Sequence, residues 1–180
     1  REVKPDFYHL GETWHNGNPW LENNQFNGVM NYKLMFAMDD YFSSKTCNDE
    51  FRIAINKVFM LYTKNALSSM YNLIDSHDTV RAFTKYGSHT ELAIIFMMLF
   101  PGRPAIYYGT ELDVDGNQDP DNRKPFPWYK NTGKTYSLIQ RLIQIKQKYN
   151  PTNLKWIHTT DTIIYKLDEL LIILNKVSTQ

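Results

Sequence analysis

The stretch MYNLIDSHDT, residues 70–79, passes from an apolar run into a cluster of polar side chains. The apolar part, residues 70–74, is predicted as a β-strand, and His77-Asp78 follow shortly after it. A second stretch, LGETWH at residues 10–15, has the same form, because it ends the strand candidate at residues 7–12. Both stretches therefore predict polar groups at strand ends, where a site shared between elements can form.

Strand-like and helix-like segments alternate about four times over the first 150 residues. Further strand candidates lie at residues 26–32 and 104–109. The helical periodicity predicts helices at about residues 33–42, 46–70, 88–100 and 136–149. Such alternation favours an α/β fold with a parallel sheet and helical crossovers.

The pattern changes after Pro151. Two apolar runs, residues 163–167 and 170–174, are separated only by Asp168-Glu169. This spacing predicts an antiparallel hairpin and hence the start of a second domain. The predicted organisation is therefore a first domain over residues 1–150 and a second beginning at residues 151–180.

Composition excludes several classes of protein. A net charge of +1 over 180 residues gives no electrostatic case for binding nucleic acid or an anionic membrane surface. The apolar run at residues 92–100 is too short to cross a bilayer. A single cysteine, Cys47, excludes an internal disulfide and a cysteine-based zinc site, and no metal site is expected. Cytoplasmic location is expected over secretion, although the chain opens at Arg1 and its natural N-terminus is expected upstream.

Polar residues follow all four predicted strands in the first domain. They are Glu12, Asn31-Tyr32, His77-Asp78 and Gly109-Thr110-Glu111. The ordinary alternative for one strand-end acid is a salt bridge within a loop, but four such ends together favour a site. Trp and His beside a carboxylate suit a sugar, because aromatic rings stack on pyranose faces and carboxylates move protons. An aromatic content of 14% fits a carbohydrate-binding cleft, although most rings are expected in the core.

Four motifs carry a resemblance to a known family. GETWH at residues 11–15 resembles the acid/base motif of the α-amylase superfamily, glycoside hydrolase family 13, and residues 72–79 resemble its last conserved motif. The segment PGRPAIYYG at residues 101–109 and the loop GNQDPDNRKPFPW at residues 116–128 are similar to the neopullulanase, cyclomaltodextrinase and maltogenic amylase branch. The motifs stand in the family's order and cover nearly the whole chain.

The resemblance implies the C-terminal half of a (β/α)8 TIM barrel. The four predicted strands would be the fifth to eighth of that barrel, and the helix at residues 136–149 would close it. The hairpin after Pro151 would begin the family's C-terminal antiparallel β-sandwich.

The resemblance also implies roles for the two acidic motifs. Glu12 would be the general acid that protonates the glycosidic oxygen and then the base that activates water. Asp78 would bind sugar hydroxyls beside the scissile bond and favour the oxocarbenium-like ring. His77 would hydrogen-bond the same sugar.

Five further residues are candidate substrate contacts. By the resemblance, Trp14 and His15 would surround the leaving-group sugar, and Asp121 and Arg123 would contact sugars toward the non-reducing end. For Trp14 the alternative is a core position, and for Asp121 and Arg123 it is a salt bridge within the loop. For Arg81, ligand contact and structural pairing with an acid remain open.

One part of the family's site is missing. The nucleophile of the family lies in a Gly-x-Arg-x-Asp motif, and no such motif occurs in these 180 residues. We therefore expect the C-terminal part of a longer enzyme that acts on α-glucan oligosaccharides and is inactive as an isolated chain. No cofactor is expected here, while a structural calcium would belong to the N-terminal part. A homodimer or association with that N-terminal half is expected; the alternative is a non-catalytic carbohydrate-binding or structural fragment.

Overall fold

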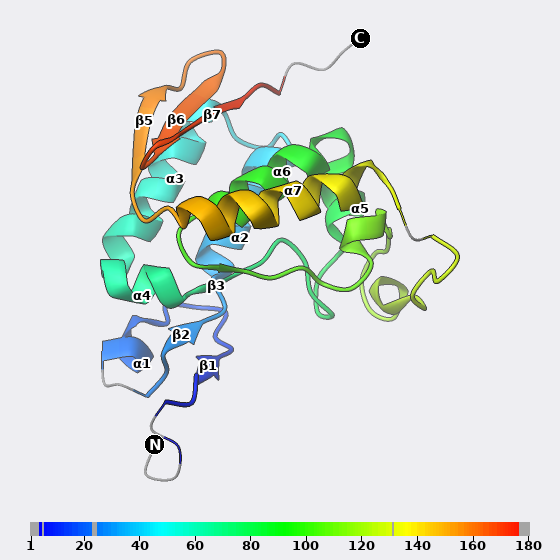
Figure 1. Ribbon diagram of the computed structural model, residues 1–180, viewed down its shortest axis with the longest axis horizontal. Helices are drawn as coiled ribbons and strands as arrows, with labels where there is room; N and C mark the ends of the chain where they lie inside the picture. The colour runs from blue at the N-terminus through cyan, green and yellow to red at the C-terminus, as the bar shows by residue number, and fades with distance from the viewer. Residues whose placement is uncertain (1–3, 5, 23–24, 131, 177–180) are drawn as a thin grey trace.

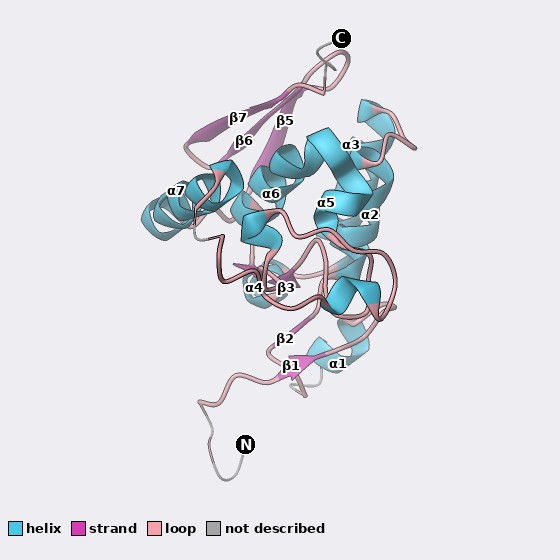
Figure 2. Ribbon diagram, turned by 90° about the vertical axis from the view of Figure 1, so that its right-hand side faces the viewer, coloured by secondary structure: helices cyan, strands magenta, loops and turns pink. Residues whose placement is uncertain are grey.

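The computed structural model describes residues 4, 6–22, 25–130 and 132–176. A group of helices lies between two sets of strands (Figure 1). Figure 2 shows the antiparallel strands at one end of the molecule and the first two parallel strands at the other.

Four short parallel strands form the first set. β1 pairs in parallel with β2, β3 pairs in parallel with β4, and a parallel bridge from Met30 to Tyr71 joins the two pairs. The strands are β1 (Leu10–Gly11), β2 (Gly28–Val29), β3 (Tyr71–Asn72) and β4 (Arg103–Pro104). Each lies within or overlaps a predicted strand, but each is only two residues long. The predicted parallel pairing of the strands is confirmed. The predicted strand lengths are wrong.

Buried asparagines hold these strands together. Asn31 and Asn72 are fully buried, and Nδ2 of Asn31 donates to Oδ1 of Asn72 across 2.9 Å. Nδ2 of Asn72 donates in turn to the carbonyl oxygen of Pro101 at 3.0 Å, just before β4. Since an unpaired buried amide costs free energy, this chain of bonds fixes how the β2, β3 and β4 segments meet.

Seven α-helices lie within the described residues. They are α1 (Asn18–Glu22), α2 (Tyr32–Phe42), α3 (Asn48–Leu61), α4 (Lys64–Ser69), α5 (Ala82–Tyr86), α6 (Thr90–Leu99) and α7 (Lys134–Tyr149). The predictions for α2 and α7 are confirmed to within two residues. The single helix predicted over residues 46–70 is wrong, because Tyr62 and Thr63 are extended and a new helix begins at Lys64. Oγ1 of Thr63 accepts a hydrogen bond from the backbone N–H of Ala66 at 3.2 Å and so caps α4.

The second set is a three-stranded antiparallel sheet in the order β5-β6-β7. The predicted hairpin is confirmed as β6 (Ile163–Leu167) and β7 (Leu170–Leu174), whereas β5 (Leu154–His158) was not predicted. The sheet shares the core of the helices: the ring centroid of buried Tyr165 lies 5.5 Å from that of Phe96 in α6. Nε1 of Trp156 also donates to Asn56 in α3 at 2.8 Å. The division into two domains at residue 150 stays a prediction.

A buried lysine joins α7 to the end of α6. Lys146 is 8% exposed, and its Nζ donates to the carbonyl oxygen of Phe100, the C-cap residue of α6, at 2.6 Å. Burial lowers the pKa of Lys146 from 10.5 to about 8. The charged ammonium is therefore held in the fold at a cost in free energy.

We expect the unfolding free energy to rise with pH above about 8 because of Lys146. Between that lowered pKa and 10.5, the unfolded chain keeps a proton that the folded chain has lost, so deprotonation favours the fold. From pH 8 to 10 this should add about 2 kcal/mol. Urea denaturation at pH 7 to 10 should show this rise in the native sequence and not in Lys146→Met. Parallel pH curves for the two proteins would show that Lys146 does not titrate in this range.

Candidate active site

Glu12 lies at the carboxyl end of β1 and is exposed. Gly11 precedes it, and a Cβ there would lie 2.6 Å from the ring of Phe26, so this strand end requires glycine. The hydroxyl of Tyr32 donates to Oε1 of Glu12 at 3.3 Å. The Glu12 carboxyl group is thus exposed to solvent beside one hydrogen-bond donor.

His77 and Asp78 lie beyond the carboxyl end of β3. Nε2 of His77 lies 3.2 Å from Oδ2 of Asp78, and both side chains are at least one third exposed. The backbone N–H of Asp78 donates to Oγ of Ser76 at 3.2 Å. The second predicted motif therefore also places accessible polar groups at a strand end.

Tyr32, the first residue of α2, connects these two strand ends. Its side chain is 1% exposed, and its pKa is raised to about 12 by burial first and then by the charge of Glu12. The nearby Ser76 hydroxyl lowers this pKa in part, and the charge of Asp78 adds to the rise. The pKa of the Tyr32 phenol thus depends on the charges of both carboxylates. Tyr32 was predicted at a strand end, but no role was predicted for it. Its position at a strand end was the one signal in the sequence that could have identified it.

Trp14 stacks on Tyr32. Their ring centroids are 4.0 Å apart with an interplanar angle of 14°, and Phe36 lies 6.3 Å from Trp14. Trp14 remains 42% exposed, so the core position that composition left open is wrong. His15 is exposed beside it. The predicted sugar contacts of Trp14 and His15 stay predictions.

The loop at residues 116–128 lies against the second motif. Nδ2 of buried Asn122 donates to the carbonyl oxygens of His77 at 2.7 Å and Thr79 at 2.9 Å. Nε of Arg123 donates to the same oxygen of His77 at 3.1 Å, and its Nη2 lies 3.6 Å from Oδ1 of Asp78. Two segments about 45 residues apart in sequence are therefore held together at the site.

Asp121 is bound within its own loop. It accepts from the backbone N–H of Asn117 at 2.7 Å and pairs with Nζ of Lys124 at 3.3 Å. The Asn117 N–H first, and Lys124 in addition, hold the pKa of Asp121 below its usual range. The alternative of an ion pair within the loop is thus realised for Asp121, and its sugar contact stays a prediction.

Ligand contact and structural pairing were the two alternatives for Arg81, and its burial favours a structural role. Arg81 is 0% exposed, and its guanidinium donates to the carbonyl oxygens of Tyr108 and, at 3.4 Å, Val114. It also lies 4.4 Å from the centroid of the Tyr107 ring. Because the segment at residues 107–114 covers it, Arg81 holds that segment in place rather than reaching a ligand.

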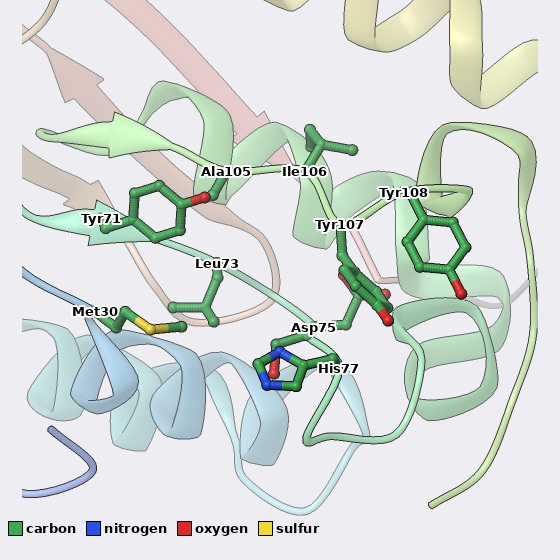
Figure 3. A pocket seen from close by; sticks show the side chains of 10 residues that line it. Met30, Tyr71, Leu73, Asp75, His77, Ala105, Ile106, Tyr107 and Tyr108 are labelled. Atoms are coloured by element: carbon green, nitrogen blue, oxygen red, sulfur yellow. The ribbon is translucent and has the colours of Figure 1, made fainter. Parts of the chain in front are cut away.

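A cavity of about 170 Å³ lies beside the second motif (Figure 3). Its lining residues are Met30, Tyr71, Leu73, Asp75, Ser76, His77, Ala105, Ile106, Tyr107 and Tyr108. His77 and Tyr107 lie at the same end of it. Asp75 is buried there and accepts from the Ala82 N–H and the Thr110 hydroxyl, both at 2.9 Å. Burial raises the pKa of Asp75, and its two donors identify it as a structural residue.

Two kinds of feature are absent from the described part of the chain. Its His, Cys, Asp and Glu residues form no group of three or more that could hold a metal ion. None of its helices is long and apolar enough to cross a membrane.

Comparison with known proteins places the chain in a family. The family described as "Alpha amylase, catalytic domain" matches residues 1–179. A cyclomaltodextrinase from Bacillus sp is 36% identical over an alignment of 155 residues, and the match covers 83% of this chain and 28% of that protein. An intracellular maltogenic amylase from Bacillus subtilis is 39% identical over an alignment of 154 residues, and the match covers 82% of this chain and 26% of that protein.

A solved structure of a cyclomaltodextrinase has the same fold. It superposes with a TM-score of 0.88 at 32% identity and covers 97% of this chain and 33% of that one. The chain therefore spans about a quarter to a third of the length of these relatives. The family match extends over almost every residue, and the relatives share the fold as well as the sequence. The chain belongs to the α-amylase catalytic-domain family, whose fold is a TIM barrel.

Proposed function

We propose that this chain is the C-terminal half, strands five to eight, of the (β/α)8 barrel of a retaining α-glucan hydrolase. β1 to β4 would be those four strands, and the sheet of β5, β6 and β7 would begin the C-terminal β-domain. The proposal is supported by four parallel strands whose carboxyl ends carry the polar residues, as in barrel enzymes generally.

One observation carries the chemistry: Tyr32 donates to Glu12 and also responds to the charge of Asp78. Glycoside cleavage needs a protonated carboxyl near the leaving oxygen and negative charge near the developing cation. We assign the first role to Glu12, which then accepts a proton from the attacking water. We assign the second role to Asp78, with His77 and Arg123 binding hydroxyl groups of the same substrate.

The proposed reaction needs a carboxylate nucleophile that this chain does not supply. A retaining glycosidase attacks the anomeric carbon with a second carboxylate about 5 Å from the acid. The resemblance assigns it to a Gly-x-Arg-x-Asp motif, and the sequence contains none. We infer that an N-terminal half-barrel packs against this chain and supplies the nucleophile. A calcium site, if the enzyme has one, would lie in that half.

The substrates we propose are maltooligosaccharides and cyclodextrins. The relatives' names, cyclomaltodextrinase and maltogenic amylase, support this class of substrate. The exposed face of Trp14 and the stack beneath it support binding of a pyranose ring. A cytoplasmic location is proposed from the intracellular relative and the free, exposed Cys47.

The test is to purify the full-length protein that contains this chain and to incubate it with maltotriose and with β-cyclodextrin. We expect release of sugars whose first-formed reducing ends are the α-anomer in proton NMR spectra, as retention requires. The isolated 180-residue chain should release none. Turnover by the isolated chain would contradict the need for a second half, and glucan binding without turnover by the full-length protein would favour the non-catalytic alternative.

A further inference from the structure

We propose that Asn122 is a positioning residue for Asp78. Its side-chain amide holds the backbone before and after Asp78, and this fixes the direction in which the carboxylate points. Asn122 acts through Asp78 and not by touching substrate, because its own side chain is buried. This role rests on the proposed function, in which the charge of Asp78 stabilises the developing oxocarbenium ion.

The segment that carries Asp78 lies outside the helices and strands, because β3 ends at Asn72 and α5 begins at Ala82. Within it, the backbone N–H of Thr79 donates to the carbonyl oxygen of Ser76 at 3.3 Å. The backbone N–H of Ser76 donates to Oγ1 of Thr79 at 2.9 Å. These bonds close a four-residue turn with Asp78 at its third position. They leave the carbonyl oxygens before and after Asp78 to be held from outside the turn.

Asn122 binds both of these carbonyl oxygens. Its Nδ2 donates to the carbonyl oxygen of His77 at 2.7 Å and to that of Thr79 at 2.9 Å. Because carbonyl oxygens only accept, the amide nitrogen and not the amide oxygen must face them, and both of its hydrogens are used. Asn122 is 1% exposed, so water has little access to these bonds. One side chain therefore bridges the residues on either side of Asp78.

The carboxylate of Asp78 is held much less firmly than its backbone. Its side chain is 36% exposed, and its charged neighbours are Nε2 of His77 at 3.2 Å and Nη2 of Arg123 at 3.6 Å. Those two side chains are about half exposed themselves, and ion pairs at such exposure contribute little to the order of a side chain. The direction of the carboxylate therefore depends on the backbone that carries it, and Asn122 fixes that backbone.

The loop that carries Asn122 has anchors of its own. Asn122 lies in the short 3-10 helix Asp121–Arg123. Earlier in the loop, the backbone N–H of Gly116 donates to Oγ1 of Thr84 at 2.8 Å, and its carbonyl oxygen accepts from the backbone N–H of Arg81 at 2.9 Å. The loop should therefore stay attached to α5 when the Asn122 amide is removed. Such a substitution tests the two bonds to the turn and not the loop as a whole.

The experiment is Asn122→Ala in the full-length protein, made both alone and together with Asp78→Asn. Alone, it should lower kcat for maltotriose about tenfold to a hundredfold, the cost of a displaced catalytic group, with KM little changed. Added to Asp78→Asn, it should lower kcat less than twofold further, because the charge that Asn122 positions is already gone. General damage to the site would instead lower kcat by the same factor in both backgrounds, and that result would overturn the proposal.

Asn117→Ala is the matched control, because it removes the same side chain from the same loop. Asn117 is exposed, and its Nδ2 donates to Oδ2 of Asp121 at 3.3 Å and not to the turn. We expect activity within twofold of the unmodified protein. If Asn122→Ala does not fold, Asn122→Ser takes its place, since its hydroxyl can still donate to one of the two carbonyl oxygens. Its loss should be smaller and should again require the Asp78 charge.

Crystal structures of the variants provide a readout that does not depend on activity. In Asn122→Ala, residues 77–79 should shift or lose order while Gly116 keeps its bond to Thr84, and in Asn117→Ala they should stay in place. Residues 77–79 unchanged in Asn122→Ala would contradict the positioning role. If the unmodified protein cleaves neither maltotriose nor β-cyclodextrin, the proposed function is wrong, and the position of residues 77–79 alone decides whether Asn122 holds Asp78.

Discussion

Glu12→Gln in the full-length protein is expected to lower kcat for maltotriose by about a thousandfold, within the range that general acid–base catalysis contributes. Glutamine has the size of glutamate and can still accept from the Tyr32 hydroxyl at the position of Oε1. It cannot give a proton to the leaving oxygen, so the loss is chemical and KM should change little. Steady-state kinetics with reducing-sugar detection measure both constants.

The matched control for this substitution is Glu91→Gln. Glu91 is a partly exposed acid in α6 that pairs with Lys134 at 2.8 Å. The Glu91→Gln substitution makes the same change in charge as Glu12→Gln. We expect activity within twofold of the unmodified protein, because a surface ion pair contributes little to stability. A Glu12→Gln protein that retained a tenth or more of its activity would remove Glu12 from the acid/base role.

Asp78→Asn is expected to lower kcat by about a hundredfold to a thousandfold, the cost of removing one preorganised electrostatic contact. Asparagine keeps the shape of the side chain beside His77, but it removes the negative charge that we assign to the developing oxocarbenium ion. This loss should be as large on α-maltosyl fluoride as on maltotriose, because both reactions build positive charge at C1. In a single turnover, Glu12→Gln should instead spare the release of fluoride, because only the later attack of water needs Glu12 as a base, so the two carboxylates can be told apart.

Asp119→Asn controls for the arginine that the two aspartates share. Arg123 lies 2.9 Å from Asp119 and 3.6 Å from Asp78, so either substitution removes one of its partners. We expect Asp119→Asn to keep most of the activity, since that carboxylate is well exposed on the loop. Equal losses in the two variants would indicate that Asp78 acts by holding Arg123 and not through its own charge.

The positions of the parallel strands and of their polar ends could be predicted because the signals are local. An apolar run that stops at a polar cluster fixes a strand end, as at Glu12 and at His77-Asp78. The hairpin was located to the residue, since only Asp168-Glu169 separate its two strands. Strand length was not predictable, because it depends on how many residues of the neighbouring strand remain hydrogen-bonded to it.

Other features depend on contacts between distant segments. Arg81 stands three residues after Asp78, yet carbonyl oxygens at Tyr108 and Val114 decide that it is buried. Tyr32 gains its importance only because α2 starts between two strand ends that are far apart in sequence. In β5 only Leu154 and Trp156 point inward, and so short an alternation is a weak signal for a strand.

The shared core of the sheet and the helices has a consequence for how the chain comes apart. Tyr165 packs against Phe96, and Nε1 of Trp156 donates to Asn56 in α3, so we expect the last strands to unfold together with the helices. A protease cut near residue 150 would not release an independent module. It would uncover aromatic surface on α3 and α6, and the remaining chain would then be prone to aggregate.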